Sequence, residues 1–533
     1  MSSPVLSEAR EYAKHGISIE GLEAFIAGLE GTLTAETTTS TVCHSLIKPA
    51  TAPAGWVDVA ELILRDGEGN DIRDRCWFRH SYREEATGRV QDAPPPGTRS
   101  YCELLLADPA TAHQVGAPTV FFSHAWLFKF KNVAAALRAF VDGLPPGSPP
   151  QFFWFDCFSI DEHATQAKPQ EFWGSTFREA IALIGHTLML LSPWDQPFPL
   201  TRAWCLWELY CTEEAAGARF SVTLGPEEQR AFEAALLENH AAMDDAFARI
   251  DVAEAQAGSE ADRAMILGAV EASVGCAALN GIAKARMREW MCGTARRLAA
   301  NASGEGALAT KGQVATFFLV VGLLGEGKAL YREVVAGETE HHGGGHVQTL
   351  RSKLNLAILL QSEGTAEAVA EAKALYREVV AGMTEHHGGG HVETLTSKMG
   401  LANLLGTEGT AEAVAEAKAL YREVVAGQTE HHGGGHVTTL ITKFNFANLL
   451  KKEGTAEAVA EAVTLLAEVA PGFSARLGPA HPHTAMAQRS LAAARDMHRT
   501  QQAVRHPAEE GVLADEEDEL ARAIALSLRQ SWS

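Results

Sequence analysis

The sequence predicts a multidomain protein in which an α/β unit with a parallel sheet precedes an all-helical array of repeats. Its 533 residues are too many for a single hydrophobic core. Residues 119 to 224 alternate short apolar runs with helical patterns, which is typical of a parallel sheet buried on both faces. Farther along, the string TEHHGGGHV begins at Thr339, Thr384 and Thr429, and this period of 45 residues indicates stacked repeats.

Residues 1 to 115 form a first segment, which we expect to pack on the α/β unit as an extension. The stretch SIEGLEAFIAGLEG has the spacing of an amphipathic helix. The proline-rich stretch DAPPPGT, at residues 92 to 98, marks a break in regular structure. We recognise no catalytic motif in this segment.

The α/β unit, residues 116 to 225, has unusual side chains where its predicted strands end. The strands are expected in TVFFSH, QFFWFDCF, HTLMLLS and RFSVTL. Ser123, His124 and Trp126 follow the first strand, Asp156 follows the second and Trp194 follows the third. Because ligands bind at the carboxyl ends of parallel strands, we expect these side chains to line a common rim.

The helix predicted over TRAWCLWELYC, residues 201 to 211, carries a single acid, Glu208, among apolar residues. Helical spacing places Glu208 on the same face as Trp204. A carboxylate beside an indole loses part of its hydration, which costs free energy unless a hydrogen-bond donor meets it. A structural partner or a ligand must therefore supply that donor.

These residues resemble a Toll/interleukin-receptor (TIR) type domain, which has a flavodoxin-like α/β fold. The resemblance rests on SHAW at residues 123 to 126, on Asp156 and above all on the WCLWEL string at residues 204 to 209. In family members that split NAD, the glutamate of this string is catalytic, which implies that Glu208 binds ribose hydroxyls and stabilises an oxocarbenium-like state. NAD would then be a substrate, and no cofactor is expected. The resemblance implies the following further candidates: His124 and Asp156 for catalysis, and Ser123, Trp126, Trp194 and Trp204 for the NAD rim.

A structural alternative for Glu208 stays open. Arg202 stands where the family often has a serine, and SHAW replaces the usual Ser-Phe-Arg after the first strand. In this alternative Glu208 pairs with Arg202 or His124 and ties the helix to the rim, because buried acids are often members of structural ion pairs.

Residues 226 to 310 are expected to form a helical bridge, and residues 311 to 497 the repeat array. Each repeat contains two helical patterns; Gly364 is expected to end the first, and Thr365 to cap the second. The array resembles tetratricopeptide (TPR) repeats of the kinesin-light-chain type on the turn that contains His346 and Thr349. Val347 stands where that family has a proline. The resemblance implies a helical solenoid that binds a protein ligand.

One face of the first helix differs between the three similar copies. Positions 348, 351, 355, 358 and 362 change from copy to copy, whereas the second helix barely changes. Their spacing of three and four residues places them on one face of the helix. The predicted ligand-facing residues are Arg351, Asn355, Ile358, Thr396, Asn403, Ile441 and Asn448. The alternative is drift at exposed positions after a recent duplication.

The histidines of the repeated string, for example His341, His342 and His346, raise the question of a metal site. Three glycines separate them, so the ligands are poorly preorganised. His341 and His342 also end a helix, where the helix dipole favours positive charge. We therefore expect loop chemistry and no metal.

The C-terminal end follows a polar linker at residues 498 to 514. Residues 515 to 531, within DEEDELARAIALSLRQSWS, resemble a ubiquitin-interacting motif, although Gln530 stands where an acid usually follows the serine. The resemblance implies that ubiquitin is bound by Glu517, Leu520, Ala523, Ile524 and Ser527. The alternative is a solvated amphipathic helix with its acids at the N-terminal end.

Composition and targeting signals narrow the function classes. With 67 acidic and 45 basic residues the net charge is −22, which argues against binding to nucleic acid or to anionic membranes. The N-terminal residues lack a signal-peptide pattern, and the apolar run at residues 314 to 325 is too short to span a bilayer. Eight cysteines without a C-x-x-C pair predict reduced thiols in the cytosol.

The sequence therefore predicts a cytosolic signalling or adaptor protein. Its repeats are expected to bind a protein ligand, its C-terminal helix ubiquitin, and its TIR-like unit to self-associate. A TIR-type NAD hydrolase that the repeats regulate is the enzyme alternative. A kinesin-light-chain-like cargo adaptor is a third possibility, which rests on the repeats alone.

Overall fold

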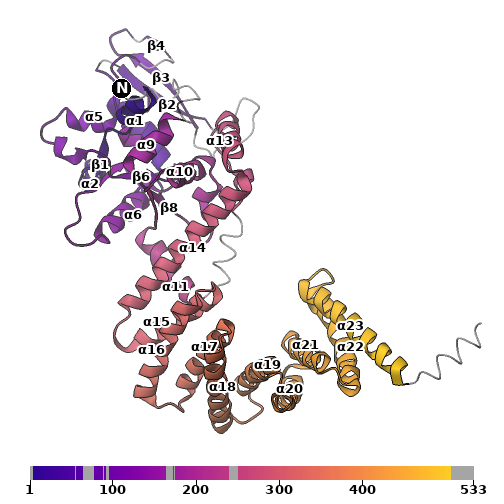
Figure 1. Cartoon of the computed structure of the whole chain (residues 1–533). Coiled ribbons are helices and arrows are strands. Elements are labelled where there is room, and N and C mark those ends of the chain that lie inside the picture. Colours follow the sequence, from indigo (N-terminus) through magenta and orange to yellow (C-terminus); the bar gives the residue numbers. More distant parts are fainter. Residues whose placement is uncertain are drawn as a thin grey trace, which may run out of the picture. The chain divides into compact units, whose positions relative to one another are not determined.

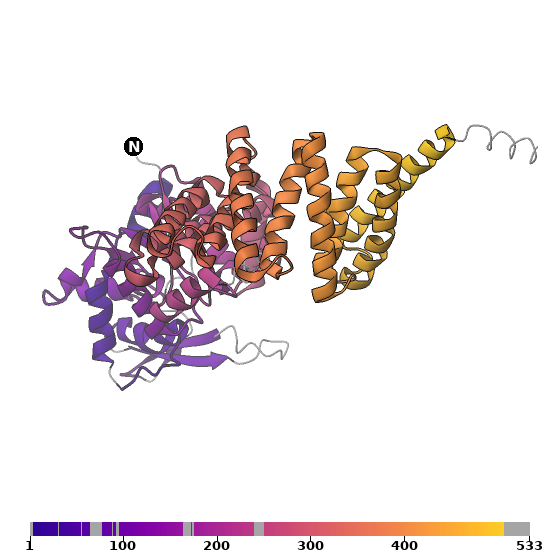
Figure 2. The ribbon, with the colours of Figure 1, turned by 90° about the horizontal axis from the view of Figure 1, so that it is seen from below.

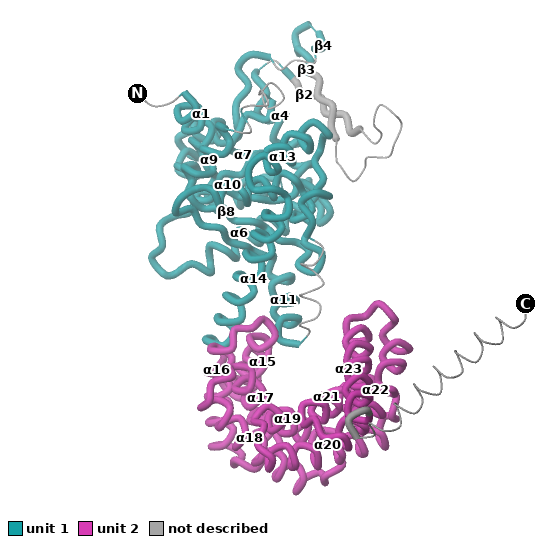
Figure 3. Tube along the Cα trace, turned by 45° about the vertical axis from the view of Figure 1, so that its right-hand side comes forward, with its two compact units in different colours: residues 1–301 teal, residues 302–533 magenta. Residues whose placement is uncertain are grey.

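A computed structural model describes residues 4–29, 31–54, 56–63, 77–87, 89–91, 95–163, 172, 175–238 and 250–505. The chain divides into two compact units, unit 1 at residues 1–301 and unit 2 at residues 302–533 (Figure 1; Figure 3).

Unit 1 is built around a six-stranded sheet of order β5-β1-β7-β6-β8-β9 (Figure 1). The strands are β1 (Gly16–Ser18), β5 (Val115–Gly116), β6 (Val120–Ser123), β7 (Phe152–Trp154), β8 (His186–Leu190) and β9 (Arg219–Thr223). Strands β6 to β9 are parallel, which confirms the parallel sheet expected over residues 119 to 224. Strands β1 and β5 join it in antiparallel pairing, so the N-terminal segment extends the sheet as well as packing on it.

Helices cover both faces of this sheet, which is why β6 and β8 are buried along their whole length. Helices α2 (Ile19–Gly28) and α6 (Phe130–Asp142) share a core with Phe122 on one face. On the other face lie α1 (Pro4–Tyr12), α9 (Thr176–Ile184) and α10 (Ala203–Glu214). There Phe121 stacks on Trp154 with ring centroids 4.7 Å apart. Alternating side chains along each strand thus build two separate cores.

The N-terminal segment also contains a small antiparallel sheet that the sequence patterns did not predict. Its strands are β2 (Trp56–Ile63), β3 (Trp77–Glu84) and β4 (Val90–Gln91). Short helices accompany it: α3 (Thr39–Val42), a π-helical turn (Cys43–Ile47), α4 (Lys48–Thr51) and α5 (Tyr101–Leu106). Ser100 and Glu103 form a capping box that begins α5.

The region expected as a helical bridge is helical in its described part, and its helices up to Asn301 belong to unit 1. They are α11 (Pro226–Glu238), α13 (Glu260–Ser273) and α14 (Cys276–Asn301). Helix α14 is fixed to α10 by a bidentate contact of Arg286 with Glu213, with both N···O distances at 2.6–2.7 Å. Trp290 of α14 stacks on Phe232 of α11 at 4.1 Å.

Unit 2 is an array of helical hairpins, as the 45-residue period predicts (Figure 2). The first helices are α15 (Ala307–Val320), α17 (Val347–Glu363), α19 (Val392–Glu408), α21 (Val437–Glu453) and α23 (Pro482–Arg505). The second helices are α16 (Leu324–His342), α18 (Ala366–His387), α20 (Ala411–His432) and α22 (Ala456–Leu477). Successive first helices contact one another and lie on the inside of the curved array (Figure 3).

The turns of the array confirm the expected capping residues. Gly364 ends α17 with a left-handed φ of 72°, and the Thr365 hydroxyl accepts a hydrogen bond from the Ala368 amide at the start of α18. His346 caps α17, because its Nδ1 accepts from the Gln348 amide at 3.2 Å. The repeated histidines thus take part in helix capping, in line with loop chemistry.

In three hairpins, a buried lysine fixes the two helices to the turn that precedes them. Lys398 donates to Glu423 at 2.6 Å and to the carbonyl of Gly389 at 3.1 Å. The equivalent lysines, Lys353 and Lys443, bind the equivalent glutamates in the same way. The frame of the array is therefore the same from repeat to repeat.

In the described part of the chain, one helix, α22, is long and apolar enough to span a membrane. The bent pair of α13 and α14 is also long and apolar enough when the two helices are taken as one segment. In the array α22 packs between α21 and α23 and buries Leu466, Val469 and Phe473. The seven cysteines in the described residues are free thiols.

A close helix contact in the array leads to a first testable prediction. A Cβ at Gly382 in α18 would lie 2.6 Å from Leu350 Cδ1, whereas a Cβ at Gly312 in α15 would meet no atom within 4 Å. We expect Gly382→Ala to lower the free energy of unfolding by about 1–2 kcal/mol, because overpacking exceeds the gain in helix propensity. Gly312→Ala is the matched control and should raise it by up to about 1 kcal/mol. Hydrogen exchange of unit 2 checks both, and equal stabilisation by the two variants would contradict the contact.

Candidate functional site

The carboxyl ends of β6 and β7 bring together several of the predicted rim residues. Ser123 ends β6 and is fully buried, and His124 follows it. Asp156 begins the short helix α7 (Asp156–Ser159) directly after β7. Its carboxylate accepts a hydrogen bond from the Trp126 indole at 2.6 Å and lies 3.9 Å from His124 Nε2. The sheet order places the strand-order reversal beside β6, where open α/β sheets bind ligands.

Burial favours the neutral form of the His124 imidazole. Burial lowers its pKa, against the opposing effects of Asp156 and of a backbone hydrogen bond at Phe122. Its ring stacks on Phe122 at 5.2 Å and contacts Phe155 at 4.8 Å. Within the described residues its Nε2 has no hydrogen-bond partner. This nitrogen is therefore the part of His124 that is left to meet a ligand.

Glu208 points from α10 toward the same group of residues. Burial raises the pKa of Glu208 to about 8, the Ser123 hydroxyl lowers it and the charge of Asp156 raises it further. In the described part of the chain, Glu208 Oε2 and Ser123 Oγ are both buried, and neither has a partner within hydrogen-bonding geometry. No ion pair joins Glu208 to Arg202 or His124 among the described residues, so the expected structural alternative finds no partner there.

Two residues near the rim, Tyr12 and Lys48, come from the N-terminal segment, in which the sequence patterns indicated no site residue. Tyr12 of α1 is buried, and its pKa is raised well above the usual value, first by burial and then by the charges of Glu162, Asp156 and Glu208. The Tyr12 hydroxyl therefore lies near three carboxyl groups. Burial and Asp156 raise the pKa of Glu162 to about 8, against the effect of Lys48. Only the fold brings the N-terminal segment here, so no local signal marks Tyr12 or Lys48.

Two predicted rim residues, Trp194 and Trp204, pack against the helices α11 and α9. The Trp194 ring packs against Phe232 of α11 at 5.8 Å, and the Trp194 amide donates to Glu228 at 3.0 Å. The Trp204 ring contacts Phe177 of α9 at 5.9 Å. The structure thus gathers Ser123, His124, Trp126, Asp156 and Glu208, and holds the Trp194 ring against α11.

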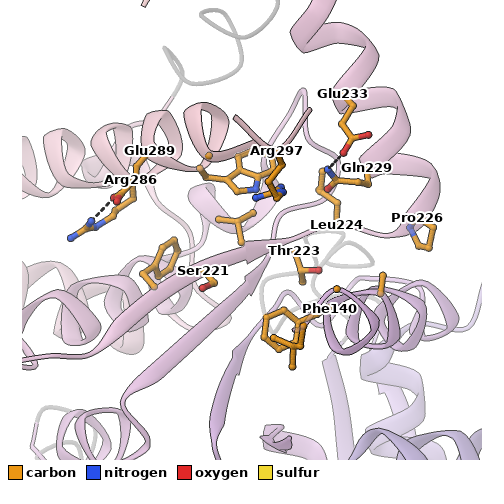
Figure 4. A pocket seen from close by; sticks show the side chains of 17 residues that line it. Phe140, Ser221, Thr223, Leu224, Pro226, Gln229, Glu233, Arg286, Glu289 and Arg297 are labelled. Atoms are coloured by element: carbon orange, nitrogen blue, oxygen red, sulfur yellow. Dashed lines mark hydrogen bonds and ion pairs between the residues drawn. The ribbon is translucent and has the colours of Figure 1, made fainter. Parts of the chain in front are cut away.

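A cavity of about 680 Å³ lies beside the edge strand β9, and its lining comes from β9, α6, α11 and α14 (Figure 4). Gln229 donates to Glu233 at 2.6 Å, and Arg286 pairs with Glu289 at 2.6 Å, within its wall. Neither Glu208 nor any other predicted rim residue lines it. This cavity is therefore separate from the group of residues around Glu208.

The predicted ligand-facing residues of the repeats lie on the first helices, but they are exposed to solvent to different extents. Arg351 and Thr396 are exposed, whereas the other five are half-buried: Asn355, Ile358, Asn403, Ile441 and Asn448. Arg351 pairs with Glu393 of the next repeat at 2.7 Å.

The asparagines of this set make contacts within the array. The side-chain oxygen of Asn403 accepts hydrogen bonds from Tyr421 and Asn445, and that of Asn448 accepts from Ser490 at 2.9 Å. Part of the predicted binding face thus holds the array together. The exposed positions are the ones left for a ligand.

A group that is able to hold a metal ion occurs in the second copy of the repeated string. Ligand atoms of His387, His391 and Glu393 lie within 4.8 Å of one another. His391 Nδ1 accepts a hydrogen bond from the Glu393 amide at 3.3 Å, and Glu393 also binds Arg351. Metal binding through His391 Nδ1 would compete with this helix cap. The expectation of loop chemistry without a metal stays a prediction.

The ubiquitin-interacting motif lies outside the described residues. The predicted contact residues Glu517, Leu520, Ala523, Ile524 and Ser527 therefore stay predictions.

Comparison with known proteins finds similar solved structures. A crystal structure of a single-residue variant of a Podosopora anserina kinesin-light-chain candidate with nearly identical TPR-like repeats is 25% identical, with a TM-score of 0.32, and the match covers 41% of this chain and 99% of that one. A second crystal structure of that protein is 26% identical, with a TM-score of 0.32, over 40% of this chain and 98% of that one. BtubC (BKLC) from P. vanneervenii is 13% identical, with a TM-score of 0.27, over 52% and 92%. No family model and no curated protein matches the chain.

Proposed function

We propose that this protein is a cytosolic scaffold that binds a protein ligand along the inner face of its repeat array. The observation that carries the proposal is the contrast between a constant frame and a varied face. The lysine and glutamate contacts, the caps and the glycine turns recur at the same positions in the three similar copies. The exposed positions of the first helices differ, for example Arg351 and Thr396.

This contrast supports recognition more than drift. Helices α18 and α20 have the same residues at their exposed positions, for example alanine at both 374 and 419, whereas α22 differs more and has Thr464 there. Drift after duplication changes exposed positions on either helix, whereas ligand contact changes one face. An interface of standard size buries about 800 Å² on each partner, which requires several neighbouring helices such as the contacting first helices supply.

The test places bulky charges on one face or the other. Thr396→Arg with Thr438→Arg alters exposed inner positions, and Ala374→Arg with Ala419→Arg adds the same charge to exposed positions of the second helices. Ligands captured by crosslinking to the full chain are purified, and their affinities are measured for both variants. We expect the inner variant to weaken binding by at least about 10-fold and the matched variant to leave it unchanged. Equal effects of the two variants would contradict the groove as the binding site.

The proposal includes a ubiquitin-reading C-terminal helix, which rests on the sequence pattern. We expect weak binding of mono-ubiquitin, because a single helix buries less than the roughly 1,200 Å² of a standard interface. Ala523→Arg should abolish binding by preventing close approach, whereas Gln530→Glu should leave it equal or stronger. Chemical-shift titration of labelled ubiquitin with the full chain checks this, and unchanged spectra with wild type would refute the motif.

The second candidate function is NAD hydrolysis by the TIR-like unit. The observation that favours it is the group of Ser123, His124, Asp156 and Glu208 at the strand ends, with buried polar atoms left unpaired in the described residues. In this function Glu208 stabilises positive charge on the ribose as the nicotinamide bond breaks, and self-association of the unit assists. The scaffold and the enzyme are compatible, because they use different units.

A further inference from the structure

A second cavity, of about 400 Å³, lies within unit 2 between α15, α16 and α17. Its wall combines apolar groups, such as Leu308 and Val334, with the side chains of Gln348, Ser352 and Asn355. Glu338 of α16 also lines it. A cavity of this size is near the lower end for small-molecule sites and suits a single long side chain.

Glu338 is a buried acid that the fold leaves unpaired. The residue is only 4% exposed, and its Oε2 has no hydrogen-bond partner among the described residues. The nearby hydroxyl of Tyr331 is engaged by Thr316. Burying a carboxylate without a donor costs free energy in general, so the retention of Glu338 in a cavity wall needs another explanation than folding.

The equivalent positions of the other repeats show what folding alone uses there. Met383 and Phe473 stand one and three periods later, and both are buried apolar residues. Gln428, two periods later, is buried and accepts a hydrogen bond from Thr442 at 2.8 Å. At this position the other copies therefore have either no polar group or a satisfied one. The charge of Glu338 is an addition to the common frame.

Two cations near the cavity, in the described part of the chain, are bound to other acids. Arg351 lines the same cavity, but its guanidinium binds Glu393 at 2.7 Å. Lys311 of α15 binds Glu333 at 2.8 Å. Within the described residues these two cations are therefore taken, and a ligand can supply a cation to Glu338.

We propose that this cavity receives a lysine or arginine side chain of the protein ligand, whose cation pairs with Glu338. The inference rests on the proposed binding of a protein to the inner face. The apolar wall accommodates the methylene stem, and the oxygens of Ser352, Asn355 and Gln348 accept the remaining N–H groups. The net charge of −22 favours the approach of a basic ligand.

The experiment is affinity selection on immobilised full chain from an octapeptide library in which one position is fixed as lysine, arginine, norleucine or glutamate. We expect lysine and arginine to be enriched over norleucine with wild type. Glu338→Gln and Glu338→Met should each reduce the affinity of a selected basic peptide by roughly 30-fold or more, because one partner of a buried pair is lost. Glu340→Gln, which changes an exposed acid of the same helix outside the cavity, should change it less than about 3-fold.

The outcomes separate the inference from the function on which it rests. Peptides that bind without a basic preference, or whose preference survives Glu338→Gln, would overturn the basic pocket and leave the groove in place. No peptide binding to wild type would contradict both. An independent readout is thermal unfolding, in which Glu338→Met, the residue of the next copy, should raise the midpoint. A lowered midpoint would show that Glu338 has a structural partner, and would also overturn the inference.

Discussion

Full-length protein is expected to release nicotinamide from NAD, and Glu208→Gln to lower that rate by at least about 100-fold. Glutamine keeps the size and part of the hydrogen bonding of the side chain, but removes the charge that stabilises an oxocarbenium-like state, and loss of one preorganised group has this scale. The matched control is Glu214→Gln, an exposed acid at the end of the same helix, which should keep the wild-type rate. Equal turnover by wild type and Glu208→Gln, or none in any assembly state, would make Glu208 a non-catalytic residue.

The rate of NAD cleavage by the wild-type protein should also depend on pH. The pKa of Glu208 is raised to about 8, so the free protein carries the required carboxylate only as the pH approaches that value. We therefore expect the rate of NAD cleavage by wild type to increase between pH 6 and about pH 8. A profile that falls over this range would indicate that protonated Glu208 acts as an acid instead.

The free energy of unfolding of unit 1 should decrease with rising pH, whereas the rate of NAD cleavage should increase. Because the folded-state pKa of Glu208 lies above the unfolded value of about 4.5, the folded state holds this proton more tightly. Its stabilising contribution is complete below the unfolded value and is lost as the pH rises toward about 8. Glu208→Gln should thus match wild type at pH 5 and exceed it at pH 8 by about 2–4 kcal/mol. Hydrogen exchange of α10 at both pH values checks this, and destabilisation at both would indicate a structural partner.

The second large effect concerns the core of the repeat array, where Tyr421→Ala should destabilise unit 2 by about 3–5 kcal/mol. Tyr421 is only 3% exposed and stacks on Phe446 with centroids 5.4 Å apart. Its hydroxyl donates to Asn403 of the first helix in the same hairpin. Removing the ring leaves a cavity between neighbouring repeats, whose stability depends on nearest-neighbour contacts.

Tyr421→Phe is the control for the ring alone. It keeps the packing and removes one hydrogen bond, while Asn403 still accepts from Asn445 at 3.4 Å, so a loss of about 1 kcal/mol is expected. Denaturant unfolding followed by hydrogen exchange in residues 411 to 450 measures both variants. A cost of Tyr421→Phe equal to that of Tyr421→Ala would place the energy in the hydrogen bond and contradict the packing argument.

Features that depend on short-range physics could be predicted from the residues alone. Gly364 and Thr365 act at one turn, so their capping roles follow from the local pattern. The period of 45 residues determined the stacking, because each hairpin repeats the same contacts with its neighbour. The parallel strands followed from apolar runs that alternate with helices, and the gathering of Ser123, His124 and Asp156 followed from the rule that strand ends share one edge.

Contacts between residues far apart in the chain could not be predicted in this way, because they depend on how the helices and strands pack. Tyr12 lies near Glu208 only because α1 packs on the same sheet face, and nothing in its local sequence indicates that position. Trp194 follows a strand end as predicted, but packing with Phe232 holds its ring against α11. Glu338 occupies a position where other copies have core residues, and its meaning appears only with the cavity beside it. Periodicity fixes which face a residue occupies, whereas burial and partners depend on which other element covers that face.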